Sequence, residues 1–508
     1  MAAMQASSFS STLIPTKVEQ DLFDICLATA ALEGKGTTVR VAGGWVRDKL
    51  LGLNNDDIDL ALDNMTGVEF GKSLQTYMKS TPKSSNVKTN VIKANPDQSK
   101  HLETVTAHFC GFEIDITNLR SETYSDGSRI PEIKIGTPEE DALRRDLTIN
   151  SLFYNLNLKI VEDFTGRGIA DLENKICSTP LDPRVTFIDD PLRILRTVRF
   201  ATRFRFNIDP AIITSCHDED IRLSLSRKVS RERLGKEMEG MLSGRNAHFL
   251  TCLKSFHEMN LLPLIFTTNL FDDIPYREEV TPERWATMLE ATTCLDILLT
   301  DGPSFLGPLI STSSKRTSLL ASALVPFDGV VSNKMSKNKP LAESFAVLQW
   351  SLKLKTRDCS DIAIIVGGLS RLTDLADSAL QRQNDPLFRV DLGVLLRELK
   401  DLWKPCFLVA ASLRLHSRTG GSVPPNIETM EEHIEAFKQL LNSIDGLKLH
   451  NVWTLLRPLV NGDELKTILG VSAGPKIGET MRAQTLWQLE HPQGTKERFL
   501  ETITSTDK

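Results

Sequence analysis

The stretch from residue 43 to residue 63, GGWVRDKLLGLNNDDIDLALD, constrains the fold of this chain more than any other part of the sequence. Acidic and apolar residues alternate in its DIDL portion, and a period of two is that of a β-strand. Asp57 and Asp59 should therefore point to one face of the strand, and Ile58 and Leu60 into a core. We expect a sheet here, with paired carboxylates on its open face.

Two glycines precede this strand. TTVRVAGG predicts a strand that ends at Gly43 and Gly44, and WVRDKLLG predicts a short helix that ends at Gly52. Backbone amides beside a glycine pair can approach a phosphate, and the helix N-terminus, with Arg47 one turn on, adds positive potential. The alternative is an ordinary turn followed by a solvated strand end.

Paired carboxylates repel each other unless a divalent cation lies between them, and hard oxygen ligands suit Mg²⁺ with phosphate completing its shell. We therefore interpret Asp57 and Asp59 as metal-binding residues. A two-metal site needs a third carboxylate from a neighbouring strand. Asp115, in GFEIDITNLR, is the best candidate, with Glu113 on the same face and Glu103 on the preceding strand as alternatives.

Residues 189–205, DDPLRILRTVRFATRFR, predict a helix with arginines along one face and an apolar stripe beside them. The arginines are Arg193, Arg196, Arg199 and Arg203, and the stripe is Leu192, Leu195 and Val198. No acidic residue separates the arginines, which favours contact with phosphate or nucleotide over a solvated face.

Asp190 and Arg193 lie one turn apart at the start of this helix. Together they offer a hydrogen-bond acceptor and donors to the edge of a base, and such a pair could select nucleotides without a nucleic-acid template. The alternative for Asp190 is an N-cap, because Pro191 follows it.

A second polar group lies in residues 141–155, DALRRDLTINSLFYN. Asp146 and Asn150 share a helical face and suit a ribose hydroxyl, beside Arg144 and Arg145. Arg145 could equally form a structural pair with Asp141 at the same spacing. Both interpretations stay open at this point.

The overall pattern predicts an α+β protein of 508 residues, with a small N-terminal α/β head and a long all-α body. Residues 87–117 alternate like strands of an antiparallel or mixed sheet, residues 118–137 read as a mobile polar loop, and helical periodicity dominates from Asp141 onward. We expect breaks in the helical part at 301–316, 331–340 and 417–426.

Composition adds several exclusions. The net charge of -6 means that any basic surface must be local, and no apolar run is long enough for a membrane helix. Eight separated cysteines without a CxxC pair indicate reduced thiols. The first seventeen residues lack a secretory core, so we expect a protein of the cytoplasm, the mitochondrion or also the nucleus, neither secreted nor membrane-bound.

The sequence resembles the class II CCA-adding enzymes, which are tRNA nucleotidyltransferases of the polymerase β-like superfamily, and the eukaryotic type in particular. The resemblance rests on GGWVRDKLLG with DDIDLAL, DALRRDLTINSLFYN, DFTGRGIADL, DDPLRILRTVRF and KVSRERLGKEMEGML, in family order. It implies template-independent addition of C, C and A to the 3′ end of tRNA from CTP and ATP, with Mg²⁺ at a two-metal site.

The resemblance also assigns roles. Asp57 and Asp59 match the metal-binding carboxylates, Gly43, Gly44 and Arg47 the triphosphate-side motif, and Arg144, Arg145 and Asp146 the ribose-binding block. Asp190 and Arg193 match the protein template, although Asp189 stands where the family usually has Glu. Ser230 to Arg233 with Glu237 match a helix that supports the template, and residues 118–136 match the family's flexible loop.

From the same resemblance we expect a flexible extension at residues 1–17, a nucleotidyltransferase head at 18–180, a nucleotide-selecting neck at 181–250, a body at 251–410 and a tRNA-contacting tail at 411–508. A monomer is favoured. Two other functions stay open: a poly(A) polymerase of the same superfamily, and a catalytically idle tRNA-binding protein.

Overall fold

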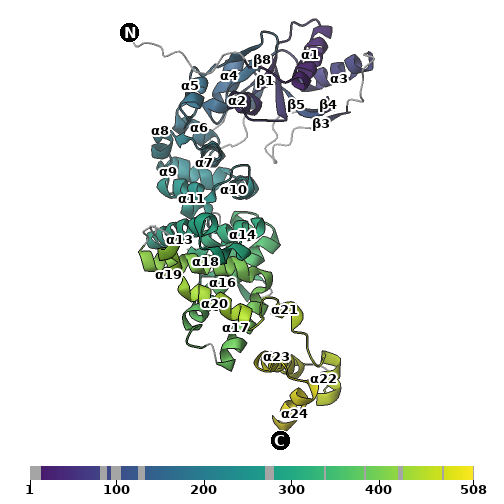
Figure 1. The fold of residues 1–508 in the computed structure, drawn as a ribbon. Helices are drawn as coiled ribbons and strands as arrows, with labels where there is room; N and C mark the ends of the chain where they lie inside the picture. The colour runs from purple at the N-terminus through teal and green to yellow at the C-terminus, as the bar shows by residue number, and fades with distance from the viewer. Residues whose placement is uncertain are drawn as a thin grey trace. The chain divides into compact units, whose positions relative to one another are not determined.

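The computed structural model describes residues 13–80, 88–92, 104–123, 132–268, 280–336, 339–382, 385–420, 427–471 and 474–506. The chain divides into two compact units, Met1–Ile265 and Phe266–Lys508. The first unit contains a mixed sheet and helices, and the second is helical apart from one hairpin in its described part (Figure 1). This confirms the α+β class. The five finer domain boundaries stay predictions.

A seven-stranded sheet forms the centre of the first unit. Its order is β3 (Lys88–Ile92), β4 (Thr104–Phe109), β5 (Phe112–Asn118), β2 (Asp57–Leu62), β1 (Val39–Ala42), β8 (Phe153–Asn155) and β9 (Ile160–Glu162). Strands β2 and β5 are parallel, and every other neighbouring pair is antiparallel. The sheet is therefore mixed, as predicted.

Helices α1 (Lys17–Leu32) and α3 (Gly67–Ser80) pack against each other and against strands of the sheet. Ile58 and Leu60 are fully buried in the same core as Phe70 and Leu74 of α3. This confirms that the apolar residues of the DIDL strand face inward. The acidic face of β2 is therefore left open on the side away from that core.

Further helices of the first unit lie between and after the last strands of the sheet in the chain. They are α4 (Pro138–Leu143), α5 (Gly168–Glu173), α6 (Pro183–Asp189), α7 (Leu192–Phe204), α8 (Pro210–Ser215), α9 (Glu219–Lys228), α10 (Arg231–Ser243), α11 (Phe249–Glu258) and α12 (Leu262–Ile265). The short strands β10 (Ile176–Cys177) and β11 (Asn207–Ile208) pair in parallel among them.

The second unit contains α13 (Pro282–Asp301), α14 (Thr312–Ala323), α15 (Glu343–Ala346), α16 (Thr356–Ser378), α17 (Pro386–Leu399), α18 (Trp403–Thr419), α19 (Ile427–His433), α20 (Glu435–Gly446) and α21 (Val452–Leu455). Three further helices, α22 (Gly462–Leu469), α23 (Pro475–Glu490) and α24 (Lys496–Thr506), share a small core of Val460, Leu465 and Phe499. No helix in the described ranges is long and apolar enough to span a membrane.

Two expectations about irregular segments are wrong in part. Residues 118–137 include the antiparallel strands β6 (Arg120–Thr123) and β7 (Glu132–Ile135), and only 124–131 lie outside the described residues. The break expected at 331–340 is the hairpin of β12 (Val331–Ser336) and β13 (Lys339–Ala342). Both segments are polar, and a polar two-stranded ribbon leaves no apolar alternation for sequence analysis to detect.

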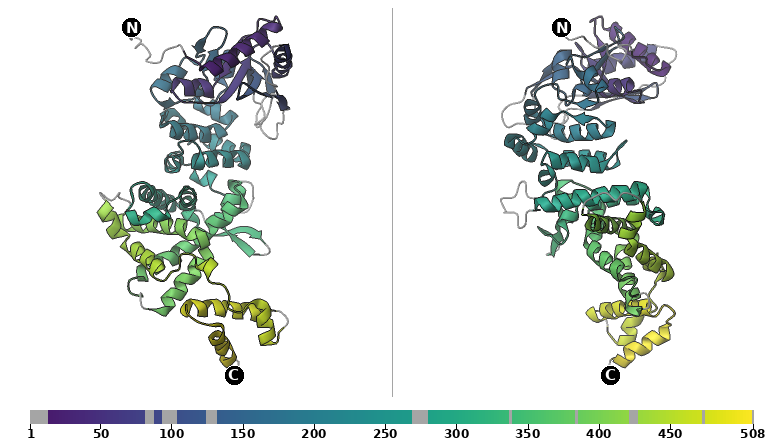
Figure 2. Two further views of the ribbon diagram at one scale, coloured as in Figure 1. Left: turned by 45° about the vertical axis from the view of Figure 1, so that its right-hand side comes forward. Right: turned by 60° about the vertical axis from the view of Figure 1, so that its left-hand side comes forward.

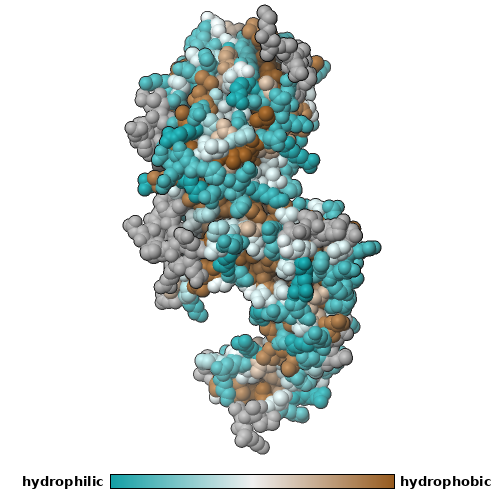
Figure 3. Space-filling model, turned by 90° about the vertical axis from the view of Figure 1, so that its left-hand side faces the viewer, coloured by the Kyte–Doolittle hydropathy of each residue, from teal (hydrophilic) through white to brown (hydrophobic). Residues whose placement is uncertain are grey.

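The cysteines agree with the reduced thiols that the sequence indicates, and the surface has an ordinary composition. All eight cysteines are free, and all but the half-buried Cys110 are buried. On the face that Figure 3 shows, hydrophilic and apolar residues are interspersed, which is ordinary for a protein surface.

Candidate active site

The acidic face of β2 is extended by β5. Asp59 is the register partner of Asp115 in the parallel pair, and Asp57 is the register partner of Glu113. The Thr106 hydroxyl of β4 donates a 2.6 Å hydrogen bond to Asp115 Oδ1, which fixes that carboxylate, while Glu113 lies 3.6 Å from His108 Nδ1. Three predicted carboxylates thus lie on two adjacent strands. The alternative residue Glu103 lies outside the described residues.

The carboxylates perturb one another. Although the Asp59 side chain is open to solvent, desolvation by the surrounding protein and then the charge of Asp57 raise its pKa to about 6. Desolvation and the charges of Asp115 and Glu113 also raise the pKa of Asp57. Crowded negative charge of this kind is what a bound cation would relieve.

The glycine pair makes a close turn beside this face. Gly43 has a φ of 67°, in the left-handed region that favours glycine, and its amide donates a 2.8 Å hydrogen bond to the carbonyl of Leu152. A Cβ at Gly43 would lie 2.8 Å from Nη1 of Arg145. The short helix predicted from WVRDKLLG is present as α2 (Gly44–Leu50), which begins one residue earlier than predicted.

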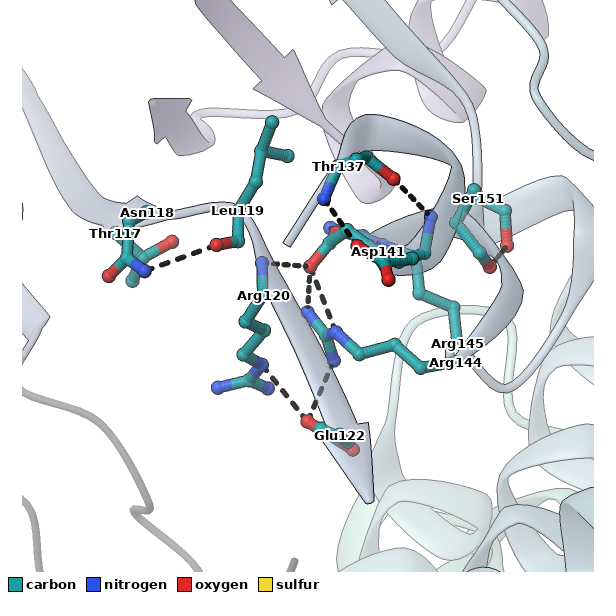
Figure 4. Close-up of polar contacts among 12 residues, drawn as sticks. Thr117, Asn118, Leu119, Arg120, Glu122, Thr137, Asp141, Arg144, Arg145 and Ser151 are labelled. Atoms are coloured by element: carbon teal, nitrogen blue, oxygen red, sulfur yellow. Dashed lines mark hydrogen bonds and ion pairs between the residues drawn. The ribbon is translucent and has the colours of Figure 1, made fainter. Parts of the chain in front are cut away.

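Arg144 and Arg145 both bind Asp141, whose side chain is 2% exposed (Figure 4). Arg145 Nη2 lies 2.8 Å from Asp141 Oδ2, and Arg144 Nε lies 2.9 Å from Oδ1. Burial alone would raise the pKa of Asp141, but the two guanidinium charges outweigh it and lower the pKa to about 2. The structural pairing of Arg145 with Asp141 is therefore present, and its ribose role stays a prediction.

A buried polar chain joins α2 to the neck helix α7. Arg47 binds Asp48 with Nε at 2.8 Å and also binds the side chain of Asn150. Asn150 donates a 3.0 Å hydrogen bond to Asp146, and Arg196 Nε lies 2.7 Å from the other Asp146 oxygen. Coulombic attraction to Arg196 and these hydrogen bonds lower the pKa of Asp146 despite its burial.

Arg47 is also packed between aromatic rings. Its guanidinium carbon lies 4.5 Å from the ring centroid of Phe204 and 5.1 Å from that of Phe200. With Arg47 only 3% exposed, its charge is shared inside the protein by Asp48, Asn150 and the two rings. Its expected triphosphate contact stays a prediction.

The arginine face of α7 exists, but carboxylates from other elements pair with it. Arg199 Nε lies 2.6 Å from Glu237 of α10, and Arg203 Nη2 lies 3.5 Å from Asp48. These ion pairs show that the face is not simply solvated, and its contact with phosphate or nucleotide stays a prediction. The apolar stripe is buried as predicted: Leu192, Leu195 and Val198.

Asp190 and Arg193 do not pair with each other. Asp190 Oδ2 accepts a 2.7 Å hydrogen bond from Arg233 of α10, and its Oδ1 accepts one at 3.2 Å from the amide of Leu192, the first residue of α7, although the N-cap position itself is Pro191. Arg193 donates to the Thr186 carbonyl at 3.5 Å, and its Nη2 lies 4.0 Å from Glu122 Oε2. Their role in reading bases stays a prediction.

Glu122 is a residue that the sequence analysis missed. Its side chain is 6% exposed, and it contacts Arg120 Nε at 3.0 Å, Arg144 Nη1 at 3.1 Å and Arg193. It thus joins the β6–β7 hairpin to α4 and to α7. A single glutamate in a polar stretch gave no signal of this.

In the part of the chain that the structure describes, no group of three or more His, Cys, Asp and Glu side chains is arranged as a metal site. Asp57 and Asp59 nevertheless fit a hard divalent cation, because both offer open carboxylate oxygens on one strand face. The remaining ligands would come from Asp115 and from substrate phosphate.

Comparison with known proteins identifies the family. Residues 39–178 match a family model described as the poly A polymerase head domain. The tRNA nucleotidyltransferase cca2 of Schizosaccharomyces pombe is 34% identical, over 96% of this chain and 97% of that protein. The chain belongs to the tRNA nucleotidyltransferase family. Another member, the mitochondrial CCA tRNA nucleotidyltransferase of Candida glabrata, is 35% identical over 92% of this chain and 90% of that protein.

Solved structures of tRNA nucleotidyltransferases share the fold. A CCA-adding enzyme in an apo form has a TM-score of 0.60 at 20% identity, covering 97% of this chain and 96% of that one. The Thermotoga maritima CCA-adding enzyme complexed with tRNA has a TM-score of 0.55 at 20% identity, covering 98% and 97%. Nucleotidyltransferases of this superfamily generally use a divalent metal ion.

Proposed function

We propose that this chain adds C, C and A to the 3′ end of tRNA from CTP and ATP, with release of pyrophosphate and without a nucleic-acid template. The observation that carries the proposal is full-length relatedness to tRNA nucleotidyltransferases in a chain that keeps Asp57, Asp59 and Asp115 on one sheet face. An idle binding protein would have no need of three carboxylates placed together at an energetic cost.

Asp57 and Asp59 are the residues that would hold the divalent cation, which we propose to be Mg²⁺ because all the ligands are oxygens. When bound, the cation supplies charge neutralisation and Lewis acidity at the reacting phosphate. Asp115 completes the acidic face, and Thr106 keeps its carboxylate oriented. A second cation would share these ligands with the substrate.

The reaction joins the terminal 3′ oxygen of tRNA to the α-phosphorus of the nucleotide, while the bond from that phosphorus to the pyrophosphate oxygen breaks. The proton of the 3′ hydroxyl leaves to solvent. Backbone amides at Gly43 and Gly44 would meet the phosphates, and Arg145, held by Asp141, adds positive charge beside Asp59. Asp146 and Asn150, which are hydrogen-bonded to each other, would bind the ribose.

Nucleotide choice falls to Asp190 and Arg193 in this proposal. Both are held by protein partners, Asp190 by Arg233 and Arg193 by the Thr186 carbonyl. These partners, on α10 and α6, orient the pair before the nucleotide arrives. A base that bonds to the pair would then compete with the same contacts. Arg196 acts behind them by fixing α7 to Asp146.

The substrates and partners follow from the same reasoning: tRNA, CTP and ATP, with no membrane. Relatives named as mitochondrial support a mitochondrial location, and we extend the proposal to the cytoplasm and the nucleus. We further propose that residues 181–250 select the nucleotide and that the helical parts at 251–410 and 411–508 hold the tRNA, with the chain acting as a monomer.

The test uses three tRNA transcripts, ending before CCA, after the first C and after the second C, each with one nucleotide at a time. We expect C on the first two and A on the third, in the presence of Mg²⁺. Incorporation on only some of them would make this a partial-addition enzyme. A long A tract on the first transcript would make it a poly(A) polymerase, and no extension of any transcript would favour the idle protein.

A further inference from the structure

Residues 331–357 of the second unit form a locally basic segment in a chain of net charge -6. The segment contains six basic residues, Lys334, Lys337, Lys339, Lys353, Lys355 and Arg357, and one acidic residue, Glu343. Glu343 is 4% exposed and accepts a 2.8 Å hydrogen bond from the Thr268 hydroxyl, so its charge is directed inward. The charged residues of this segment that the structure describes as exposed, Lys339, Lys353, Lys355 and Arg357, are therefore all basic.

The segment has a defined shape. The β12–β13 hairpin, which projects from the helices of its unit in Figure 2, leads through α15 into a π-helical turn at Val347–Ser351 and then into α16. Lys353, at a φ of 51°, lies between the turn and α16. Helix α15 contacts both strands of the hairpin, the π-helical turn and α16, so the basic residues before and after it lie around one short helix. Isolated π-helical turns occur frequently at functional sites.

The lysines at its two ends are available to a ligand. Lys339 and Lys355 are exposed, and within the described ranges neither forms an ion pair. The Arg357 side chain is 90% exposed, and its ion pair with Asp361, at 3.8 Å, is long and solvated. Exposed pairs of this kind contribute little, so Arg357 can exchange its partner for a phosphate.

Aromatic rings accompany the charges. Phe345 and Trp350 are half-buried, and their ring centroids are 6.3 Å apart in an edge arrangement. The hairpin also exposes Met335, at 57%. Cations beside partly exposed rings are typical of surfaces that bind RNA, where rings contact sugars or bases and cations contact phosphates.

We propose that Lys339, Lys355 and Arg357 contact phosphates of the tRNA substrate's backbone. The proposal rests on the proposed function, which supplies a polyanionic RNA as the occupant. Charge complementarity favours that occupant: the surface is positive in a protein that is acidic overall, and phosphate contact does not require base recognition.

The test is binding of the full-length protein to a tRNA transcript that lacks CCA, measured by fluorescence anisotropy. The KCl concentration is varied from about 50 to about 200 mM, a range over which counterion release changes the affinity strongly. We expect K339E/K355E to raise Kd about tenfold at the lower salt, and to reduce the slope of log Kd against log salt by about 1.5. The KM for tRNA should rise in parallel while the KM for CTP stays the same.

The matched control is K72E/K79E, which reverses two exposed lysines of α3, the helix that packs on the sheet face opposite to the acidic one. It should keep the wild-type Kd and slope. Circular dichroism and urea unfolding check that both proteins fold, and K339Q/K355Q gives a milder change at the same positions, with about half the effect on the slope. Wild-type Kd and slope in K339E/K355E, or an equal loss in the control, would overturn the proposal.

The result is distinguishable from a failure of the proposed function. If the wild-type protein extends no tRNA but K339E/K355E still loses affinity selectively, the function is wrong and the surface stands. If the wild-type protein adds CCA and the variant binds tRNA as the wild type does, the surface is wrong and the function stands.

Discussion

Arg196 Nε lies 2.7 Å from Asp146 Oδ2, which joins the helix proposed to read bases to the block proposed to bind ribose. Asp146 is 8% exposed and also accepts a hydrogen bond from Asn150, which in turn binds Arg47. This contact belongs to a buried chain that runs from the glycine turn to α7. The residues proposed to select the nucleotide and those proposed to bind phosphate are thus joined by hydrogen bonds.

A double-mutant cycle tests that connection. Asp146→Asn and Arg196→Gln should each lower the free energy of unfolding, and their coupling energy should be about 1–3 kcal/mol, because residues in one hydrogen-bond network are non-additive. Urea unfolding measures it. Arg184→Gln with Asp218→Asn, an exposed pair at 2.8 Å, is the control and should show coupling below about 1 kcal/mol. Additive effects at Asp146 and Arg196 would disprove the connection.

Asp59→Asn should reduce nucleotide incorporation by about 1000-fold, since it removes a proposed cation ligand. The pKa of Asp59 in the folded protein, about 6, lies above its ordinary value of 3.8. The folded protein therefore binds this proton more tightly, and the contribution of Asp59 to stability falls as pH rises from about 4 to about 6. In EDTA at pH 7.5, urea unfolding should give a larger free energy of unfolding for Asp59→Asn than for the wild type. An equal or smaller value would contradict the proposed repulsion among the carboxylates.

Asp141→Asn should destabilise the protein by about 3–5 kcal/mol, because it leaves Arg144 and Arg145 without their shared carboxylate. The pKa of Asp141, about 2, lies below its ordinary value of 3.8, so its stabilisation is complete above that value and is lost as pH falls from about 4 to about 2. Urea unfolding against pH measures this loss. If the free energy of unfolding of Asp141→Asn fell with decreasing pH as steeply as that of the wild type, the prediction would be wrong.

Gly43→Ala should lower incorporation strongly, because it strains a positive φ and forces a Cβ against Arg145 at 2.8 Å. Gly52→Ala is the matched control: its φ is 71°, but no atom lies within 4 Å of the added Cβ. Both should lose about 1 kcal/mol of stability from backbone strain, and only Gly43→Ala should also lose activity. Equal activity in the two variants would show that the turn does not shape the site.

Arg193→Ala should relax the choice among the four nucleotides while some incorporation remains. Arg199→Ala is a control on the same helix, since Arg199 binds Glu237 and not the proposed template pair. The measurement is single-nucleotide incorporation from each NTP alone on a tRNA that lacks CCA. Wild-type discrimination in Arg193→Ala would show that the template assignment is wrong.

The sequence predicted those parts of the site that depend only on the geometry of a single strand or helix. The alternation around Ile58 and Leu60 placed both aspartates on the open face, and the spacing of Leu192, Leu195 and Val198 identified the buried stripe of α7. Period and face are properties of a strand or helix itself, so a sequence contains them directly.

Partners that come from distant elements were not predictable. The acids that pair with the arginines of α7 lie on α2, at Asp146 and on α10, up to 155 residues away in sequence. Glu122 was missed for the same reason, since its contact with Arg193 depends on tertiary packing. The two polar hairpins were missed because their strands lack apolar alternation. A face rich in arginine looked free because its counter-charges are not local.

The most direct test of the central claim is extension of a tRNA transcript lacking CCA by the full-length protein, with CTP and ATP together and with ATP alone, resolved at single nucleotides. The proposed function predicts a product longer by C, C and A that then stops, little product with ATP alone, and none from Asp57→Ala. A long A ladder with ATP alone, or equal product from Asp57→Ala, would contradict it.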